Sequence, residues 1–230
     1  MIRKKTFAAG MVIAGGMNDI GLEFAAMAAR DGCELILTDW QPQALSQARE
    51  ALSGIAGARP HVIEEAPSEA GFAARTMDNC LMYSLLGERP FALDCLVQVI
   101  DFSQTPADPW ATDSAGPEQR LRAALELNEI FLQLMYERGS GAILNILVEP
   151  ELEEAWLHEV YEDTRTLLLE MGESINLRDK TPGVGIYNLF LSPTSVLFQT
   201  PPARADIAPS FDPFSCSSHE IAGYGYQLLG

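Results

Sequence analysis

A glycine-rich turn lies between an apolar run and an alanine-rich helical pattern near the start of the chain. The turn is Gly15-Gly16-Met17-Asn18-Asp19-Ile20-Gly21, and it follows Phe7 to Ala14. A second apolar run, residues 33–38, ends at Asp39. Glycines at such a turn let backbone N–H groups at a helix N-terminus approach a pyrophosphate, and an acid that ends the second strand can accept ribose hydroxyls. The stretch therefore predicts the opening strand–turn–helix–strand unit of a dinucleotide-binding sheet.

A second set of candidate residues follows in the latter half of the chain. Asn128 lies in a long helical pattern over residues 117–137, and Tyr161 and Arg165 lie four apart in another over 150–173. Residues four apart share one face of a helix, so the arginine would favour the ionised phenol and lower its pKa. An aromatic residue followed by a basic one at this spacing is also common on amphipathic helices. The spacing alone is therefore weak evidence for a catalytic pair. Only the order and distance of the two residues after the fifth predicted strand give it weight.

Composition limits the classes of partner. The 230 residues are 47 % hydrophobic and 20 % charged, which suits a single globular domain over residues 1–230. The formal net charge of −17 argues against a nucleic-acid or anionic-membrane partner, because phosphate groups would be repelled. The four cysteines show no CxxC spacing and the three histidines are far apart, so we expect no metal site.

The first residues resemble a signal peptide, with a basic stretch at residues 3–5 followed by an apolar run. The same run is needed as the first strand of the sheet, however, since it leads directly into the glycine-rich turn. We therefore expect a cytoplasmic protein.

The remaining chain alternates between apolar runs and helical patterns. Strands are predicted at 60–64, 91–100, 141–148, 185–191 and 223–229, and helices at 41–52, 68–86, 117–137 and from Pro150. Residues 193–218, rich in proline, serine and aspartate, form an irregular arm. The pattern predicts an α/β fold with a Rossmann-like, doubly wound parallel sheet of about seven strands in three α/β/α layers.

The order of these motifs resembles the short-chain dehydrogenase/reductase family over essentially the whole chain. Members of that family have a Rossmann sheet, a nicotinamide cofactor and an Asn-Ser-Tyr-Lys set that passes a proton while a hydride moves. The family's TGxxxGxG turn matches residues 14–21, with Gly15 and Gly21 kept, and its NNAG segment falls on residues 98–101. Asp39 stands where an acid favours NAD over NADP. The resemblance also implies that residues 193–218 are the substrate loop.

The cofactor positions depart from the family's pattern. Asp19 replaces the middle glycine of the turn, and Asp101 adds a carboxylate at the end of the fourth strand. Two unit charges about 4 Å apart repel by roughly 1 to 4 kcal/mol, which weakens binding about ten- to a thousandfold. Asp19 has an alternative use as a cap of the following helix. These changes predict that the chain itself binds no nicotinamide cofactor.

The catalytic positions depart as well. The family's serine position falls on Val148, which can neither donate nor accept a hydrogen bond. The YxxxK motif reads Tyr161-Glu162-Asp163-Thr164-Arg165, so an arginine replaces the lysine, and only Asn128 and Tyr161 are kept. Arginine's planar head is a poor substitute for an ammonium that grips ribose hydroxyls. The resemblance therefore implies a degenerate, non-catalytic member.

In the family, the helices before and after the fifth strand pack against a neighbouring subunit as a four-helix bundle. The counterparts here are helices 117–137 and 150–173, and the latter has a wide apolar face. We expect a hetero-oligomer, a tetramer, with an active NAD-binding paralogue that also contacts the strand at 223–229. The alternative for this face is that it only covers its own sheet. The alternative functions are an atypical NAD(H) oxidoreductase using Tyr161 and Arg165, and a ligand-binding regulatory protein.

Overall fold

Strands and helices alternate from Ala8 to Leu191. The computed structural model describes residues 8–17, 20–55, 57–65, 70–87, 89–102, 116–150, 155–178 and 183–191. The strands are β1 (Ala8–Ala14), β2 (Glu34–Asp39), β3 (His61–Glu64), β4 (Phe91–Asp101), β5 (Gly141–Val148) and β6 (Val184–Leu191). The helices are α1 (Ile20–Arg30), α2 (Pro42–Ser53), α3 (Phe72–Leu86), α4 (Pro117–Arg138) and α5 (Ala155–Arg178). This alternation confirms the predicted α/β class.

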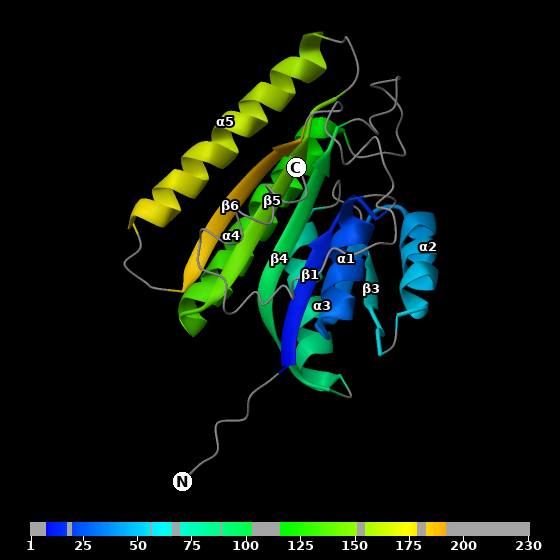
Figure 1. Cartoon of the computed structure of the whole chain (residues 1–230). Helices are drawn as coiled ribbons and strands as arrows, with labels where there is room; N and C mark the ends of the chain where they lie inside the picture. Colours follow the sequence, from blue (N-terminus) through cyan, green and yellow to red (C-terminus); the bar gives the residue numbers. More distant parts are fainter. Residues whose placement is uncertain are drawn as a thin grey trace.

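The six described strands form one parallel sheet in the order β3-β2-β1-β4-β5-β6 (Figure 1). The chain winds from β1 outward to β3 and then returns to the other side of β1 to form β4. Strand β1 is thus paired on both sides, with Met11 opposite Leu35 of β2 and Cys95 of β4. Where the strand order reverses in this way, a crevice opens at the carboxyl ends of the strands. The topology therefore predicts a ligand site at the ends of β1, β2 and β4.

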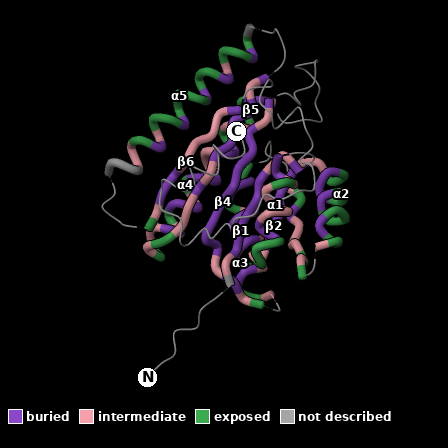
Figure 2. The backbone as a smooth tube through the Cα atoms, in the orientation of Figure 1, coloured by how far each residue is buried: buried purple, intermediate pink, exposed green. Residues whose placement is uncertain are grey.

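Helices cover both faces of the sheet and leave its central strands mostly buried (Figure 2). On one face α1 and α2 pack on a core that includes Ile13 and Val97. On the other face α3 and α4 pack on a core that includes Val12 and Leu96, and α5 packs beside α4 and on β6. Neighbouring residues of a strand enter different cores because successive side chains point to opposite faces. Strand β4 contributes to both cores, as its continuous apolar run predicts.

Most predicted elements agree with the structure to within a few residues. Helix α3 begins at Phe72 rather than at residue 68, and α5 runs to Arg178, beyond the predicted end at 173. The predicted arm at 193–218 and the predicted strand at 223–229 lie outside the described residues, as does Asp19. Among the residues that the structure describes, no helix is long and apolar enough to cross a membrane.

The glycine-rich turn connects β1 tightly to α1. Gly15 and Gly16 have φ angles of +79° and +66°, in the left-handed region that favours glycine. The Gly15 N–H donates to the Thr38 carbonyl oxygen at 2.9 Å, and the Gly21 N–H donates to the Gly16 carbonyl oxygen at 2.9 Å. A Cβ on Gly15 would lie 2.6 Å from the Val99 carbonyl oxygen. The turn therefore rests directly on the backbone of β4.

We predict that Gly15→Ala lowers the free energy of unfolding by about 2–5 kcal/mol, because it adds left-handed strain to a close contact with a carbonyl group. Gly54→Ala is the matched control, since Gly54 has a φ of −75° and no other heavy atom closer than 3.8 Å to the added Cβ. The control changes that free energy by less than about 1 kcal/mol. Urea unfolding followed by circular dichroism measures both variants, and equal effects would contradict the role of the turn.

Candidate functional site

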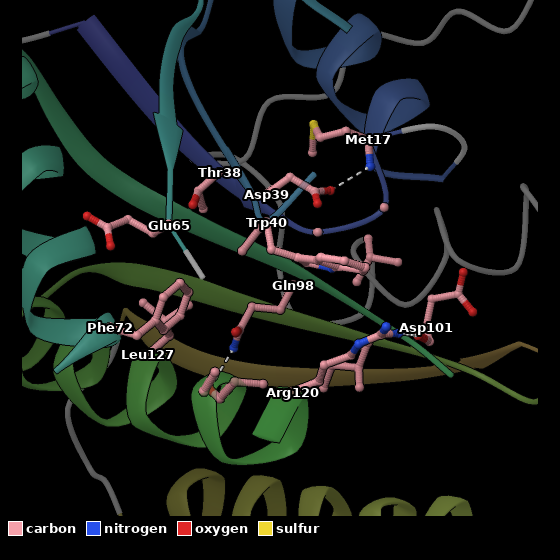
Figure 3. Close-up of a pocket in the computed structure, with 17 residues that line it drawn as sticks. Met17, Thr38, Asp39, Trp40, Glu65, Phe72, Gln98, Asp101, Arg120 and Leu127 are labelled. Carbon is pink, nitrogen blue, oxygen red and sulfur yellow. Dashed lines mark hydrogen bonds between the residues drawn. The ribbon is translucent and has the colours of Figure 1, made fainter. Parts of the chain in front are cut away.

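An open cleft lies at the carboxyl ends of β1, β2 and β4, where the topology predicts a ligand site. The space between its walls measures about 700 Å³ and is continuous with the solvent. Its floor is largely apolar, and its polar side chains come from β2, β4, α4 and the residue after β3 (Figure 3). The lining residues are Ala14, Gly15, Gly16, Met17, Thr38, Asp39, Trp40, Glu65, Phe72, Gln98, Val99, Ile100, Asp101, Arg120, Ala123, Ala124 and Leu127.

The predicted cofactor positions fall partly in this cleft. Gly15, Asp39 and Asp101 line it, whereas Gly21 supports the turn from within α1. Asp19 lies outside the described residues, so its predicted repulsion of phosphate stays a prediction. The cleft therefore lies where the sequence predicts a dinucleotide site, and its chemistry depends on what the individual side chains contact.

The carboxylate of Asp39 already has partners within the chain. Its two oxygens accept the Met17 N–H at 3.3 Å and the Gln41 N–H at 3.0 Å. Burial raises the pKa of Asp39, while these backbone hydrogen bonds and the charge of Arg120 act in the opposite direction. The acid predicted to accept ribose hydroxyls is thus bound to the glycine-rich turn, and the Met17 N–H is not available to a phosphate.

Arg120 and Trp40 meet across the cleft, a contact that the sequence does not reveal. The Arg120 guanidinium lies 4.9 Å from the centre of the Trp40 ring and donates a 2.7 Å hydrogen bond to the Asp101 carbonyl oxygen. Burial lowers the pKa of Arg120, and the carboxylates of Asp101 and Asp39 oppose that shift. Trp40 directly follows a strand and Arg120 lies in the first turn of α4. No spacing rule links two such positions.

Asn128 belongs to a buried chain of side-chain amides. The Gln98 amide nitrogen lies within hydrogen-bonding distance of the Asn128 Oδ1 (2.5 Å), the Asn145 Oδ1 (3.2 Å) and the Ala124 carbonyl oxygen (3.0 Å). Asn145 donates in turn to the Asn188 Oδ1 at 3.0 Å. Asn128 is completely buried and does not line the cleft. Its side chain therefore connects α4 to the sheet.

Tyr161 is enclosed by apolar side chains between α5 and the sheet. It is 5 % exposed and belongs to a core with Ile100, Phe102 and Leu147. Burial raises its pKa, with a smaller contribution of the same sign from Glu149, and Arg165 acts in the opposite direction. A tyrosine that transfers protons at neutral pH needs a lowered pKa. This environment shifts the phenol the other way.

Arg165 and Val148 do not join Tyr161 in a common cavity. The Arg165 guanidinium lies 3.3 Å from Glu162 and 5.3 Å from the centre of the Phe190 ring, and its side chain is 45 % exposed. Val148 is buried in the core beneath α1 and α2, on the opposite face of the sheet from Tyr161. None of the four positions predicted as catalytic lines the cleft. In the described part of the chain, no cluster of His, Cys, Asp or Glu residues could hold a metal ion.

Solved structures of oxidoreductases share this fold. A bulky-bulky ketone specific alcohol dehydrogenase from Comamonas testosteroni matches 97 % of this chain and 85 % of its own, with a TM-score of 0.64 and 15 % identity. A protein described as a short-chain dehydrogenase/reductase matches 81 % and 75 %, with a TM-score of 0.58 and 19 % identity. The chain has the fold of a short-chain dehydrogenase/reductase.

An NAD⁺-bound xylitol dehydrogenase has the same architecture, with 16 % identity, a TM-score of 0.62 and coverage of 82 % of this chain and 72 % of that one. No protein-family model matches the chain, and no curated protein matches it in sequence. At these identities the likeness extends to the fold and not to the site.

We predict that the pKa of the Tyr161 phenol lies above the usual value of 10, and Tyr161→Phe tests this by removing the phenol. Because the folded state favours the protonated phenol, its contribution to stability is complete below pH 10 and is lost as the pH rises through the raised pKa. The variant therefore loses less stability than the wild type in that alkaline range. Ultraviolet difference titration between the two proteins gives the pKa directly.

Arg165→Met tests the cause of the shift, since removing the guanidinium takes away an interaction that lowers the pKa of Tyr161. The phenol should then ionise at a still higher pH. A pKa below 10 for Tyr161 in the wild-type protein would contradict the buried environment described above.

Proposed function

We propose that this chain is a non-catalytic subunit of a heteromeric short-chain alcohol or hydroxyacyl-CoA dehydrogenase, in which it supports an active NAD-dependent paralogue. The observation that carries the proposal is the separation of Tyr161 from the cleft. The phenol is enclosed in a core on one face of the sheet, and Val148, at the family's serine position, is buried on the other.

The size of the catalytic loss supports this proposal. General acid–base assistance contributes typically 10²–10⁴-fold to a rate, and a lost hydrogen-bond donor to a developing oxyanion costs a similar factor. The valine at position 148 offers no such donor, and the phenol of Tyr161 has a raised pKa. A chain with both defects would contribute little to hydride transfer even with a cofactor bound. In the proposed assembly NAD is bound by the partner subunit, and this chain binds none.

The pattern of lost motifs resembles the inactive subunit of one named dehydrogenase. That enzyme, from anaerobic toluene degradation, oxidises 2-[hydroxy(phenyl)methyl]succinyl-CoA and is built from an active and an inactive chain. The resemblance rests only on which motifs have degenerated. The assignment to this substrate class therefore goes further than the rest of the proposal.

The proposed partner surface is formed by α4 and α5, together with the predicted strand at residues 223–229. On α5, Trp156 and Leu167 are 39 % and 44 % exposed, while Leu157 and Leu168 are buried against the sheet. The wide apolar face predicted from the sequence thus divides into a buried half and an exposed half. Acidic residues such as Glu159 and Asp163 lie exposed on the same helix, so a partner with basic residues on the facing helices would be selected by charge.

We predict that calorimetry with NAD⁺ and with NADH shows no micromolar binding to the purified chain, and that no alcohol is oxidised. The expected reason is that Asp39 is bound to the turn, that Asp19 adds a negative charge, and that Tyr161 is enclosed. Micromolar binding together with turnover would favour the alternative of an atypical oxidoreductase that uses Tyr161 and Arg165. Asp19→Gly tests the electrostatic part, because unchanged non-binding in that variant would mean that the aspartate is not what excludes phosphate.

We predict that a homologue with intact motifs co-purifies with the tagged chain from its native host. Leu167→Glu should abolish co-purification, because it introduces a charge into the exposed apolar half of α5. Leu86→Glu is the matched control, since Leu86 is 81 % exposed at the end of α3, a helix that is not part of the proposed surface. Loss of the partner in both variants, or in neither, would contradict the assignment to α5.

The open cleft favours a second candidate function. A cleft at the switch point of a doubly wound sheet, lined by apolar residues and a few polar groups, is a common position for a small-molecule site, which suits a ligand-binding regulatory protein on the same scaffold. Isolation of the chain from its host without any homologue would favour this candidate over the heteromer.

A further inference from the structure

Two side chains from distant parts of the sequence contact each other in the cleft. Trp40 directly follows β2, and Arg120 lies in the first turn of α4 (Figure 3). The guanidinium faces the indole ring at 4.9 Å from its centre. We call this pair the Trp40–Arg120 bridge. Because a guanidinium over an aromatic face is attracted by the ring's quadrupole, the contact holds the two walls of the cleft together.

The bridge is anchored at both ends. Arg120 donates to the Asp101 carbonyl oxygen at 2.7 Å, at the end of β4. The backbone of α4 is fixed one turn further on, where the Ala124 carbonyl oxygen accepts a 3.0 Å hydrogen bond from the Gln98 amide. Trp40 is held between Asp39 and Gln41, which are joined by the 3.0 Å hydrogen bond from the Gln41 N–H to the Asp39 carboxylate.

The bridge lies where half of a dinucleotide would bind. In a doubly wound sheet the acid at the end of the second strand accepts ribose hydroxyls, so the attached base lies beside that acid at the switch point. Here Asp39 is that acid, and the indole of the next residue lies in the adjoining space within the cleft (Figure 3). An adenine ring and the bridge would compete for this space.

We propose that the Trp40–Arg120 bridge is a built-in closure that excludes an adenosine group from the cleft. The inference rests on the proposed non-catalytic function and adds the contact that fills the space beside Asp39 where an adenosine would lie. It is separate from the charge of Asp19, since it acts on the base and ribose rather than on the pyrophosphate. Loss of either side chain would open the site.

The strength of a cation–π contact sets the size of the effect. A protein whose binding-competent state is only partly populated binds its ligand more weakly by that fraction. If one contact of this kind holds the closed state, its loss raises the affinity for adenosine about two- to thirtyfold. This range is measurable with a weakly binding ligand.

Adenosine is the probe for the test, because it is uncharged and therefore does not respond to Asp19 or to the other carboxylates as a phosphate would. Arg120→Met removes the guanidinium and keeps the volume of the side chain. Arg122→Met is the matched control, since Arg122 lies on the same helix, exposed and paired with Glu126 at 2.8 Å outside the cleft. Trp40→Ala is a second opening variant from the β2 side, in case Arg120→Met does not fold. Circular dichroism checks the folding of each variant, and ligand-observed NMR titration gives the dissociation constant.

The expected result is a two- to thirtyfold tighter dissociation constant for adenosine in Arg120→Met and in Trp40→Ala, with Arg122→Met equal to the wild type. Equal affinity in the wild type and in the opening variants would overturn the closure, as would the absence of binding in all of them. The proposed function fails by a different result, which is oxidation of an alcohol with NAD⁺ by the wild-type chain. Binding of NAD⁺ to the wild type without turnover would overturn the closure and the expectation that this chain binds no cofactor, but not its non-catalytic role.

Discussion

The packing of the centre of the molecule depends on the hydrogen bonds made by the amide side chain of Gln98. Gln98 lies in β4, the strand next to the switch point, and contacts the Asn128 and Asn145 side chains and the Ala124 carbonyl oxygen. Gln98 and Asn145 are direct register partners across β4 and β5, and Asn145 and Asn188 are partners across β5 and β6. The line of amides ends where Asn188 donates to the Leu168 carbonyl oxygen of α5 at 2.7 Å.

Such a buried network fixes the register of the elements that it joins. Each unpaired amide in an apolar core costs about 1–3 kcal/mol, so a shift of one strand by a residue would leave several such groups without partners. The network therefore holds α4, β4, β5, β6 and α5 in one arrangement. It also positions Arg120, because the Ala124 carbonyl oxygen lies one helical turn after it. The Trp40–Arg120 contact and the proposed partner helix are thus held by the same set of hydrogen bonds.

The same requirement, that buried polar groups have hydrogen-bond partners, applies to the polar groups of the cleft. In a working dinucleotide site the ligand supplies the partners of the acid and of the turn. Here the Asp39 carboxylate takes the Met17 and Gln41 N–H groups, and Arg120 takes the Asp101 carbonyl oxygen. Buried groups that are already paired gain nothing from a ligand unless it replaces each bond. In this structure the Asp39 carboxylate and the Asp101 carbonyl oxygen therefore have partners within the chain.

Periodicity and turn chemistry were enough to predict the fold. The run at residues 91–100 predicted a doubly buried strand, and the turn at Gly15 predicted the first crossover; both are present as β4 and as the junction of β1 with α1. The contacts of the cleft were beyond sequence reasoning, because Trp40 and Arg120 approach each other only through the packing of α4 against the sheet. The amide network likewise requires the strand register, which places Gln98 beside Asn145.

Tyr161 shows most clearly why a motif and a site are different things. The spacing between Tyr161 and Arg165 and their distance after β5 match the pattern of the family. A helix can keep this spacing whatever surrounds its side chains. What the spacing leaves open is the environment of each side chain. The structure gives Tyr161 a reason to be retained that needs no chemistry, since its ring packs with Ile100, Leu147 and Leu168 between the sheet and α5. An aromatic side chain in such a core contributes roughly 3–5 kcal/mol on truncation to alanine, so packing alone is enough to keep it. Arg165 correspondingly lies over Phe190 at the surface, where its charge is paired with Glu162 rather than aimed at a ribose.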